Sequence, residues 1–311
     1  MAFDSLYVAW AKAHYPKQTY YAMIKFYIDK QDKKIDKISK IKSEAQKYGI
    51  QILNYKFRQD NRTINMDENG NIVQCLFTIK KTNIHTAEIL YELRDWKGNF
   101  VDLYNEMKNR GIKQDVIKAL IYIEYFSEFG TIGELLWVIN NYKEVSQLRY
   151  ENFKKTYYSL LRELAISYDD LVSEFESVAK KHTDKTITFN NKQDYFNILY
   201  NNKRVEDISM LEKIFRQIEI LEYTFIVPTN KVGKVKVYKP EKNSLLLEYV
   251  GESKEQWFKL NNSGQSMKKN DIVYLSNVVT KKYQFKKNGE IIERESYIIN
   301  QCYNLTSLFK K

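Results

Sequence analysis

Asp169 and Asp170 are the only neighbouring acidic residues in the sequence that invite a catalytic interpretation. A pair of carboxylates can hold two Mg²⁺ ions around the attacking and leaving oxygens of a phosphoryl transfer. Acidic residues are also typical of the first turn of a helix, where the helix dipole favours negative charge. Leu171, Val172 and Phe175 follow at helical spacing. We therefore interpret the pair as a helix start and predict no catalytic residue, no metal site and no cofactor in this chain.

The overall charge predicts an anionic partner. The chain of 311 residues carries 50 Lys and Arg against 39 Asp and Glu, a formal net charge of +11. Nucleic acid is the first candidate, and an acidic protein or a membrane surface is the second. The alternative is a Lys-rich composition that follows from AT-rich coding DNA. Cys75 and Cys302 are isolated, and no apolar run reaches the length of a membrane span, so we expect a cytoplasmic protein without a membrane partner.

The C-terminal part combines cations with aromatic residues, a pattern typical of single-strand binding, in which bases stack on rings while lysines follow the backbone. Residues 231–311 hold 16 Lys and Arg against 8 Asp and Glu. Alternation predicts that Lys234, Lys236 and Tyr238 share one strand face. Since Trp257 and Phe258 are adjacent, at most one of them points outward. The alternative is that the rings fill a barrel and the lysines are solvated. The predicted contacts are Lys234, Lys236, Tyr238, Tyr249, Trp257, Tyr283, Phe285 and Lys286.

The elements that would position these residues follow from periodicity and turn signals. Helical spacing opens the chain and continues over 17–29 and 32–48, with Pro16 and Gly49 as breaks. Asn69-Gly70 between the runs 63–66 and 72–77 predicts a β-hairpin. Helices are expected over 83–95, 100–110 and 113–129, and helical spacing continues to 222 around a short strand-like piece at 186–189.

Residues 231–305 contain extended runs separated by short turns, which favours a small barrel such as an OB fold. We therefore predict an α+β multidomain chain whose N-terminal two-thirds are mostly helical. Five regions are expected: a helical region at 1–60, a hairpin with a helix-hairpin-helix pair at 61–130, a helical connector at 131–229, a β domain at 230–305 and a tail at 306–311.

Several segments resemble, in the same order, the C-terminal part of the bacterial DNA polymerase III alpha subunits, the C-family replicative DNA polymerases. The segments are residues 6–16 (LYVAWAKAHYP), the hairpin at 63–77, and residues 76–80 (LFTIK), 100–103 (FVDL), 116–121 (VIKALI) and 218–225 (IEILEYTF). The resemblance implies the end of the fingers, a tandem helix-hairpin-helix and an OB domain. The family's palm aspartates lie upstream of everything matched, and this chain has no counterpart for the palm.

The resemblance implies a DNA-binding portion of a replicative polymerase, encoded by a phage or mobile element with a divided polymerase gene. Catalysis and its Mg²⁺ would then belong to a separate palm-bearing chain in the bacterial host cytoplasm, which leaves open whether this chain counts as part of a DNA-directed DNA polymerase. The alternative is a protein derived from a polymerase that binds DNA alone, or that binds a clamp or replicase, without a role in synthesis.

The helix-hairpin-helix resemblance implies contacts with duplex DNA through Lys80, Lys81, Thr82, Lys113 and Lys118. In the family, a Gly-x-Gly turn lets backbone N–H groups approach a phosphate. Residues 81–84 (KTNI) stand at that turn here, without glycine. The alternative is a helical packing module whose lysines are solvated.

The last residues resemble the sliding-clamp-binding peptide that ends one branch of the family. Residues 304–311 (NLTSLFKK) would offer Leu305, Leu308 and Phe309 to a clamp from a flexible tail. The alternative is a final strand with Phe309 packed on the barrel. A sliding clamp is therefore the third expected partner, after DNA and the palm-bearing chain.

Overall fold

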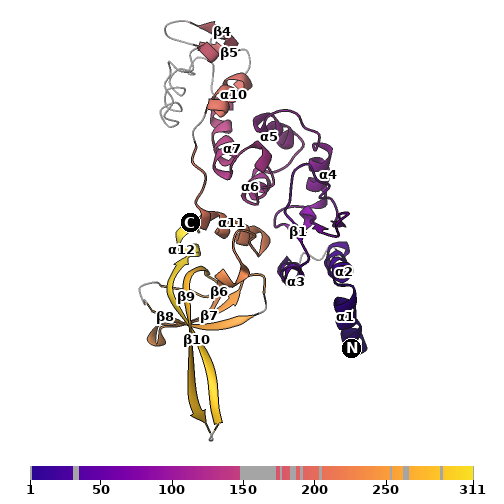
Figure 1. The fold of residues 1–311 in the computed structure, drawn as a ribbon. Coiled ribbons are helices and arrows are strands. Elements are labelled where there is room, and N and C mark those ends of the chain that lie inside the picture. Colours follow the sequence, from indigo (N-terminus) through magenta and orange to yellow (C-terminus); the bar gives the residue numbers. More distant parts are fainter. Residues whose placement is uncertain are drawn as a thin grey trace. The chain divides into compact units, whose positions relative to one another are not determined.

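The computed structural model describes residues 2–30, 35–147, 173–175, 177–182, 187–189, 192–202, 205–252, 254–261, 266–287 and 290–310 (Figure 1). Asp169 and Asp170 lie outside them. The chain is a mixture of helices and strands and divides into two compact units. The first unit comprises Met1–Tyr55, Asp60–Ile84 and Ser209–Lys311, and the second comprises Lys56–Gln59 and His85–Ile208. Within the described ranges, no helix has the length and apolar character needed to cross a membrane.

Three helices begin the first unit: α1 (Ala2–His14), α2 (Pro16–Asp29) and α3 (Ile35–Lys47). Pro16 takes the first position of α2, where its missing N–H costs nothing and its fixed φ suits the helix. Tyr20 and Ile24 of α2 are buried in one core with Ile38 and Ile41 of α3.

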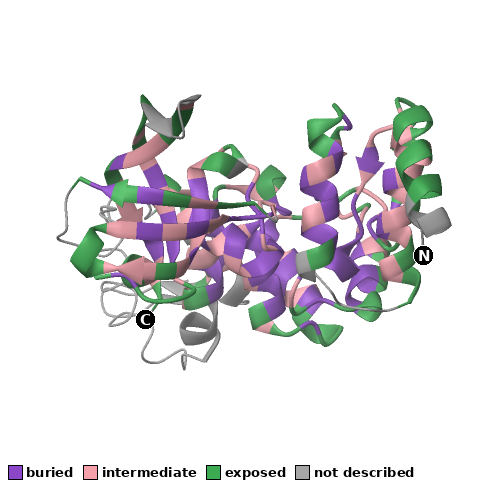
Figure 2. Ribbon diagram, turned by 90° about the horizontal axis from the view of Figure 1, so that it is seen from below, coloured by how far each residue is buried: buried purple, intermediate pink, exposed green. Residues whose placement is uncertain are grey.

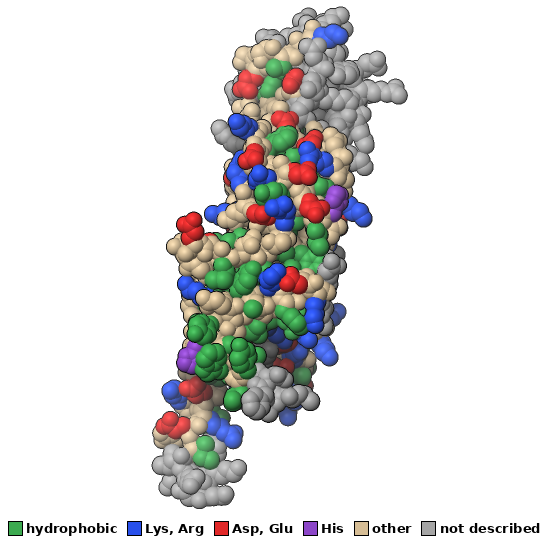
Figure 3. All heavy atoms as spheres, turned by 90° about the vertical axis from the view of Figure 1, so that its right-hand side faces the viewer, with side chains coloured by type: hydrophobic (Ala, Val, Ile, Leu, Met, Phe, Trp, Pro, Cys, Tyr) green, Lys and Arg blue, Asp and Glu red, His purple; other side chains and the backbone are tan. Residues whose placement is uncertain are grey.

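The outward sides of α1 and α2 expose large apolar residues that line a shallow groove of about 730 Å³. Tyr7, Trp10, Tyr15 and Phe26 are among them. A space-filling view likewise shows hydrophobic side chains gathered at the surface (Figure 3). Exposed apolar clusters of this kind mark interaction sites more often than single exposed residues do.

The predicted hairpin is confirmed: β2 (Asn65–Met66) pairs antiparallel with β3 (Ile72–Val73). Gly70 has φ +75°, and Asp67 accepts the backbone N–H groups of Asn69 and Asn71 through the turn. A third short strand, β1 (Ile52–Leu53), pairs parallel with β3. Alternation alone did not predict this pairing. The chain then forms a 3-10 turn, η1 (Leu76–Thr78), that is buried throughout.

The second unit is mainly helical. Among its described residues, the helices are α4 (Ile84–Glu92), which starts at the unit boundary, α5 (Phe100–Asn109), α6 (Gln114–Tyr122), α7 (Ile132–Gln147) and α10 (Lys192–Asn202). The same residues include a 3-10 turn η2 (Ser127–Phe129) and a two-stranded sheet of β4 (Ala179–His182) and β5 (Ile187–Phe189). The predicted pair α5–α6 is present, joined at Gly111, whose φ is +87°. In the core of this unit, the ring of Phe126 contacts the rings of both Phe57 and Phe100.

The C-terminal part of the first unit is helix α11 (Met210–Leu221) followed by a closed five-stranded barrel. The strands are β6 (Val232–Lys239), β7 (Ser244–Tyr249), β8 (Glu255–Leu260), β9 (Ile272–Lys287) and β10 (Glu290–Asn304), with 3-10 turns η4 (Thr229–Lys231) and η5 (Pro240–Lys242) and a last helix α12 (Leu305–Phe309). Around the barrel the order is β10-β8-β7-β6-β9, and β9 pairs back with β10. All neighbours are antiparallel except β8 and β10, which are parallel.

The barrel interior is filled by inward residues of every strand. Leu245 and Leu247 of β7, Phe258 of β8, Val273 of β9 and Ile299 of β10 are buried together. Buried positions alternate with more exposed ones along β7 and through most of β8, and Figure 2 colours the ribbon by this burial. One irregularity matters for the surface: a register shift between Val235 and Val237 places a β-bulge in β6.

Candidate nucleic-acid interface

The outer face of the barrel carries an exposed tryptophan. Trp257 of β8 is 44% exposed, whereas its neighbour Phe258 is 2% exposed and points into the core. The prediction that only one of the two points outward is therefore confirmed. Trp257 lies opposite Leu246 of β7, and Leu246 lies opposite Val237 of β6. These three side chains form an apolar row on the outer surface, because directly paired residues share a face.

A basic row runs beside this apolar row. Lys239 of β6 pairs with Ser244 of β7, which pairs with the exposed Lys259 of β8. The Nζ atom of Lys239 lies 5.1 Å from the ring centroid of Trp257, close enough for a cation–π interaction. This part of the outer surface thus presents the exposed Trp257 ring with cations next to it.

The β9–β10 hairpin has two different faces. On one face, Lys282 forms an ion pair with Glu295, and Gln284 bonds to Glu293. On the other, Lys281 lies opposite Ser296 and Tyr283 lies opposite Arg294. Tyr297 pairs with the inward Phe258, so its neighbour Ser296 belongs to the outer side that also carries Trp257. The face with Lys281, Tyr283 and Arg294 therefore continues the outer surface of β8.

The bulge in β6 corrects one expectation about single-strand contacts. Because the register shifts at this point, Val237 points outward and Tyr238 packs against the barrel core. Lys234, Lys236 and Tyr238 therefore do not form a common face. Period-two alternation holds only where no extra residue is inserted.

Tyr249 requires a second correction. Its side chain is 9% exposed and makes an edge-to-face contact with Phe258, so it fills the barrel instead of offering a stacking surface. Tyr283 is exposed, as expected. The side chains of Phe285 and Lys286 lie outside the described residues.

The two lysines predicted on β6 are both paired with carboxylates. Lys234 bonds to Glu222, which also accepts a bond from Lys80. Lys236 bonds to Glu248 at 2.7 Å, and Glu248 also accepts Lys40 of α3 at 3.3 Å. Glu222 follows α11 in a left-handed conformation, with φ +61°. Through these shared carboxylates, Lys236 connects the barrel to α3, and Lys234 connects it to the turn before α4.

The five residues predicted to contact duplex DNA do not form one cluster within either unit. Thr82 is buried, and its hydroxyl bonds to the carbonyls of Leu76 and Ile79. Lys80 is paired with Glu222 as described, and Lys81 is exposed with φ 71°.

Lys113 and Lys118 belong to the second unit. Lys113 is exposed at the N-terminal end of α6, next to the Gly111 turn, and Lys118 donates to Asn140 Oδ1 at 2.9 Å. Of the five predicted residues, Lys81 and Lys113 are therefore the two that lie exposed at turns.

The expectation of a flexible C-terminal tail is wrong, because residues 305–309 form α12. Asn304 caps this helix by accepting the backbone N–H of Ser307. Leu305 is fully buried, and the ring of Phe309 lies 5.9 Å from that of Phe215 in α11. Of the three predicted clamp contacts, Leu308 is the exposed one, at 51%.

Sequence reasoning did not single out Lys239, Lys259 or Arg294. Two of these residues could have been placed on the outer face. Lys259 stands two positions after Trp257 on the same strand and therefore lies on the same face. Arg294 follows from Tyr283 once the hairpin register is known. Lys239 could not be placed, because the bulge before it reverses the alternation.

No model of a known protein family matches this chain, and no curated protein matches it at a significant level.

Proposed function

We propose that this chain binds single-stranded DNA on the outer face of its C-terminal barrel. The observation that carries the proposal is the exposed Trp257 ring with Lys239 beside it, on a surface that continues through Lys259 to Lys281 and Arg294. A base can stack on an exposed ring of this kind while nearby cations bind the phosphates on either side of it.

The strand connectivity supports the same proposal. We propose that the barrel is an OB fold: numbered along the chain, its strands follow the order 1-2-3-5-4 with strand 4 closing on strand 1, and strands 3 and 5 are parallel. OB folds bind oligonucleotides on the face of strands 2 and 3, between the loop after strand 1 and the loop after strand 4. Trp257 lies on strand 3 of this numbering, and the β9–β10 hairpin is the loop after strand 4.

We further propose that the chain is the DNA-binding part of a replicative polymerase assembly, with catalysis on a palm-bearing chain. The ordered resemblance to polymerase III alpha subunits supports this role, as does the helix pair α5–α6 joined at Gly111, with Lys113 at its turn. Duplex contact at such a helix-hairpin-helix turn would position DNA without reading its sequence. The clamp-binding role has less support, because Leu305 is buried and Phe309 contacts α11.

The binding proposal is tested by substituting Trp257. Anisotropy of a labelled oligo(dT) should show that Trp257→Ala weakens binding about 5- to 150-fold, because stacking contributes about 1–3 kcal/mol per base. Trp257→Phe keeps a ring and should retain most of the affinity. Lys239→Ala and Lys259→Ala should lower both the affinity and its salt dependence.

Lys25→Ala is the matched control, since Lys25 is an exposed lysine on α2 that pairs with Asp29 of the same helix. It should leave binding unchanged. If Trp257→Ala binds oligo(dT) as tightly as the unaltered chain, the barrel face is not the binding surface.

The apolar groove on α1 and α2 is the surface that we propose for the palm-bearing chain. Its exposed rings would be covered in an assembly, as is typical of stable protein interfaces. Trp10→Ser should abolish co-purification with the palm-bearing chain from the same genome and leave oligo(dT) binding intact. Retained co-purification would exclude this surface.

A further inference from the structure

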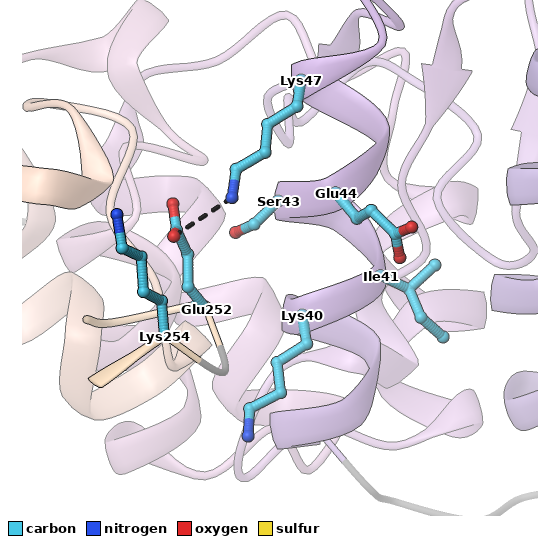
Figure 4. A pocket seen from close by; sticks show the side chains of 8 residues that line it. Lys40, Ile41, Ser43, Glu44, Lys47, Glu252 and Lys254 are labelled. Carbon is cyan, nitrogen blue, oxygen red and sulfur yellow. Dashed lines mark ion pairs between the residues drawn. The ribbon is translucent and has the colours of Figure 1, made fainter. Parts of the chain in front are cut away.

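A groove runs between α3 and the barrel, and lysines converge on it from both sides. Two cavities of about 410 Å³ and 290 Å³ share Lys40, Gly251 and Glu252 in their walls and therefore adjoin each other along this groove. Lys40 and Lys47 reach it from α3, Lys234 and Lys236 from β6, and Lys254 from the turn between β7 and β8. Figure 4 shows the part nearest to Lys47, with Lys254 extending alongside Glu252.

Three carboxylates in the groove are shared among five lysines. Glu222 binds Lys80 and Lys234, Glu248 binds Lys40 and Lys236, and Glu252 binds Lys47 at 3.1 Å. Glu255 on the rim lies 3.9 Å from Lys236, and its charge is matched by the rim lysine Lys254. Glu44 also lines the groove and pairs with Lys12 of α1 at 2.8 Å. With this pair included, the positive charges of the cluster exceed the negative charges by two.

Two of the carboxylates, Glu222 and Glu248, are held in their charged form by the lysines beside them. Burial acts to raise the pKa of Glu222, but hydrogen bonds from Lys234 and Lys80 outweigh it and leave the pKa below its ordinary value. Glu248 behaves in the same way with Lys236 and Lys40. The hydrogen bond to Glu248 raises the pKa of Lys236. The ion pairs around Glu222 and Glu248 therefore favour the charged forms of these groups.

The groove also has the donors and the shape for an oxyanion. An ammonium has three N–H donors, and a carboxylate oxygen that pairs with it uses one of them. Lys40, Lys234 and Lys236 are each about one-third exposed, so solvent screens them less than it screens a fully exposed lysine. Ser43 points from α3 toward Glu252 in Figure 4 and adds a hydroxyl donor.

We propose that this groove binds a phosphate group, as a dianion held between Lys40 of α3 and Lys234 and Lys236 of β6. The excess charge of the cluster matches a phosphate monoester or inorganic phosphate, and the lysines supply donors from two sides. The phosphate belongs either to a free nucleotide or to the end of a nucleic-acid strand. The site adjoins the outer face that carries Trp257, because Glu248 and Glu255 lie two residues from Leu246 and Trp257 on the same faces of β7 and β8. Binding of inorganic phosphate does not depend on stacking at Trp257, so the two proposals can fail separately.

Isothermal titration with inorganic phosphate tests the site, with chloride at equal ionic strength as the reference. The unaltered chain should bind one phosphate, and Lys40→Gln and Lys234→Gln should each weaken binding at least 10-fold. Lys234→Arg should retain it, which separates loss of the site from loss of folding. Lys25→Gln, outside the groove, should have no effect.

Glu222→Gln separates a ligand site from a purely structural set of ion pairs. Removing this carboxylate raises the excess charge, so phosphate should bind more tightly. An unchanged or lower affinity in Glu222→Gln, or equal phosphate effects in Lys40→Gln and Lys25→Gln, would overturn the proposal.

The source of the phosphate follows from two further titrations, with dTMP and with 5′-phosphorylated oligo(dT). Preference for dTMP identifies a free nucleotide, and preference for the oligonucleotide over its unphosphorylated form identifies a strand end. Failure to bind dTMP, the phosphorylated oligonucleotide and inorganic phosphate alike would exclude the site even if oligo(dT) still binds at Trp257.

Discussion

Lys40 and Lys42 stand two residues apart on α3 and occupy opposite environments. Lys40 lies in the groove, partly in solvent, and pairs with the carboxylate of Glu248. Lys42 is 3% exposed and has no carboxylate among its hydrogen-bond partners. The same side chain thus serves as a surface cation at one position and as a core group at the other.

The Nζ atom of Lys42 lies among three neutral oxygens. Gln74 Oε1 is 2.6 Å away, and the hydroxyls of Tyr55 and Thr78 are each 3.3 Å away. Thr78 donates its own proton to the carbonyl of Cys75, so Tyr55 donates to Thr78 and both hydroxyls can accept from Lys42. The three acceptors match the three N–H donors of an ammonium.

Two aromatic rings complete this site. The ring centroids of Tyr55 and Tyr223 lie 5.7 Å and 5.4 Å from Lys42 Nζ, and the Tyr223 hydroxyl donates to Gln74. Burial nevertheless lowers the pKa of Lys42 from its ordinary value of 10.5 to about 7. The neutral acceptors around Lys42 therefore do not offset the cost of burying its charge, and the charge of Lys42 depends on pH near neutrality.

Lys42→Met should produce the larger of the two effects that we predict for this comparison. Between pH 7 and 10.5 the folded chain binds fewer protons at Lys42 than the unfolded chain does, so the free energy of unfolding rises with pH. One proton corresponds to at most about 1.4 kcal/mol per pH unit. Urea unfolding from pH 7 to 9 should show this rise in the unaltered chain and a flatter profile in Lys42→Met.

The range ends at pH 9 because burial raises the pKa of the Cys75 thiol, which lowers stability at higher pH. Lys40→Met is the matched control and should keep the slope of the unaltered chain. Equal slopes in Lys42→Met and the unaltered chain would mean that Lys42 is not the group that titrates.

Gly251→Ala should give a smaller effect, on the groove side of the comparison. A Cβ atom there would lie 2.5 Å from Ser43 Oγ, and the φ of +79° is strained for alanine. We expect a loss of about 1–3 kcal/mol in the free energy of unfolding. Adding Ser43→Ala should recover part of it, since the remaining neighbours lie at ordinary contact distances.

Gly49→Ala is the control for this substitution. Gly49 has a similar φ of +73°, and no atom lies within 4 Å of an added Cβ. Its loss should reflect backbone strain alone, about 1 kcal/mol. Equal losses at the two glycines would show that the close approach of the added Cβ at Gly251 to Ser43 Oγ costs no stability beyond the backbone strain.

Local signals predicted much of the fold. Asn69-Gly70 predicted the hairpin, and the periodicity around Ile38 and Ile41 predicted α3. These features depend on neighbours in sequence. The alternation around Trp257 and Phe258 likewise predicted which ring faces out, because β8 has no bulge.

Long-range partners decided the rest of the candidate site. The charge of Lys234 is shared with Glu222, which no local pattern links to it, and Tyr249 is buried by Phe258 of the next strand. A lysine on a Lys-rich helix is typically solvated. Lys42 is nevertheless buried, because α3 is covered on more than one side. Such pairings follow from topology, which the residue pattern does not encode locally.

The first unit is built from chain segments that lie far apart in the sequence, and this determines when it can fold during synthesis on the ribosome. Residues 1–84 leave the ribosome first, but Tyr223, which binds Gln74 in the Lys42 site, and Gly251, which covers Ser43, follow only after residues 85–208. Domains generally fold as units while the chain grows. We therefore expect the second unit to be able to fold during translation, while α3 waits for the barrel strands before its buried lysine is enclosed.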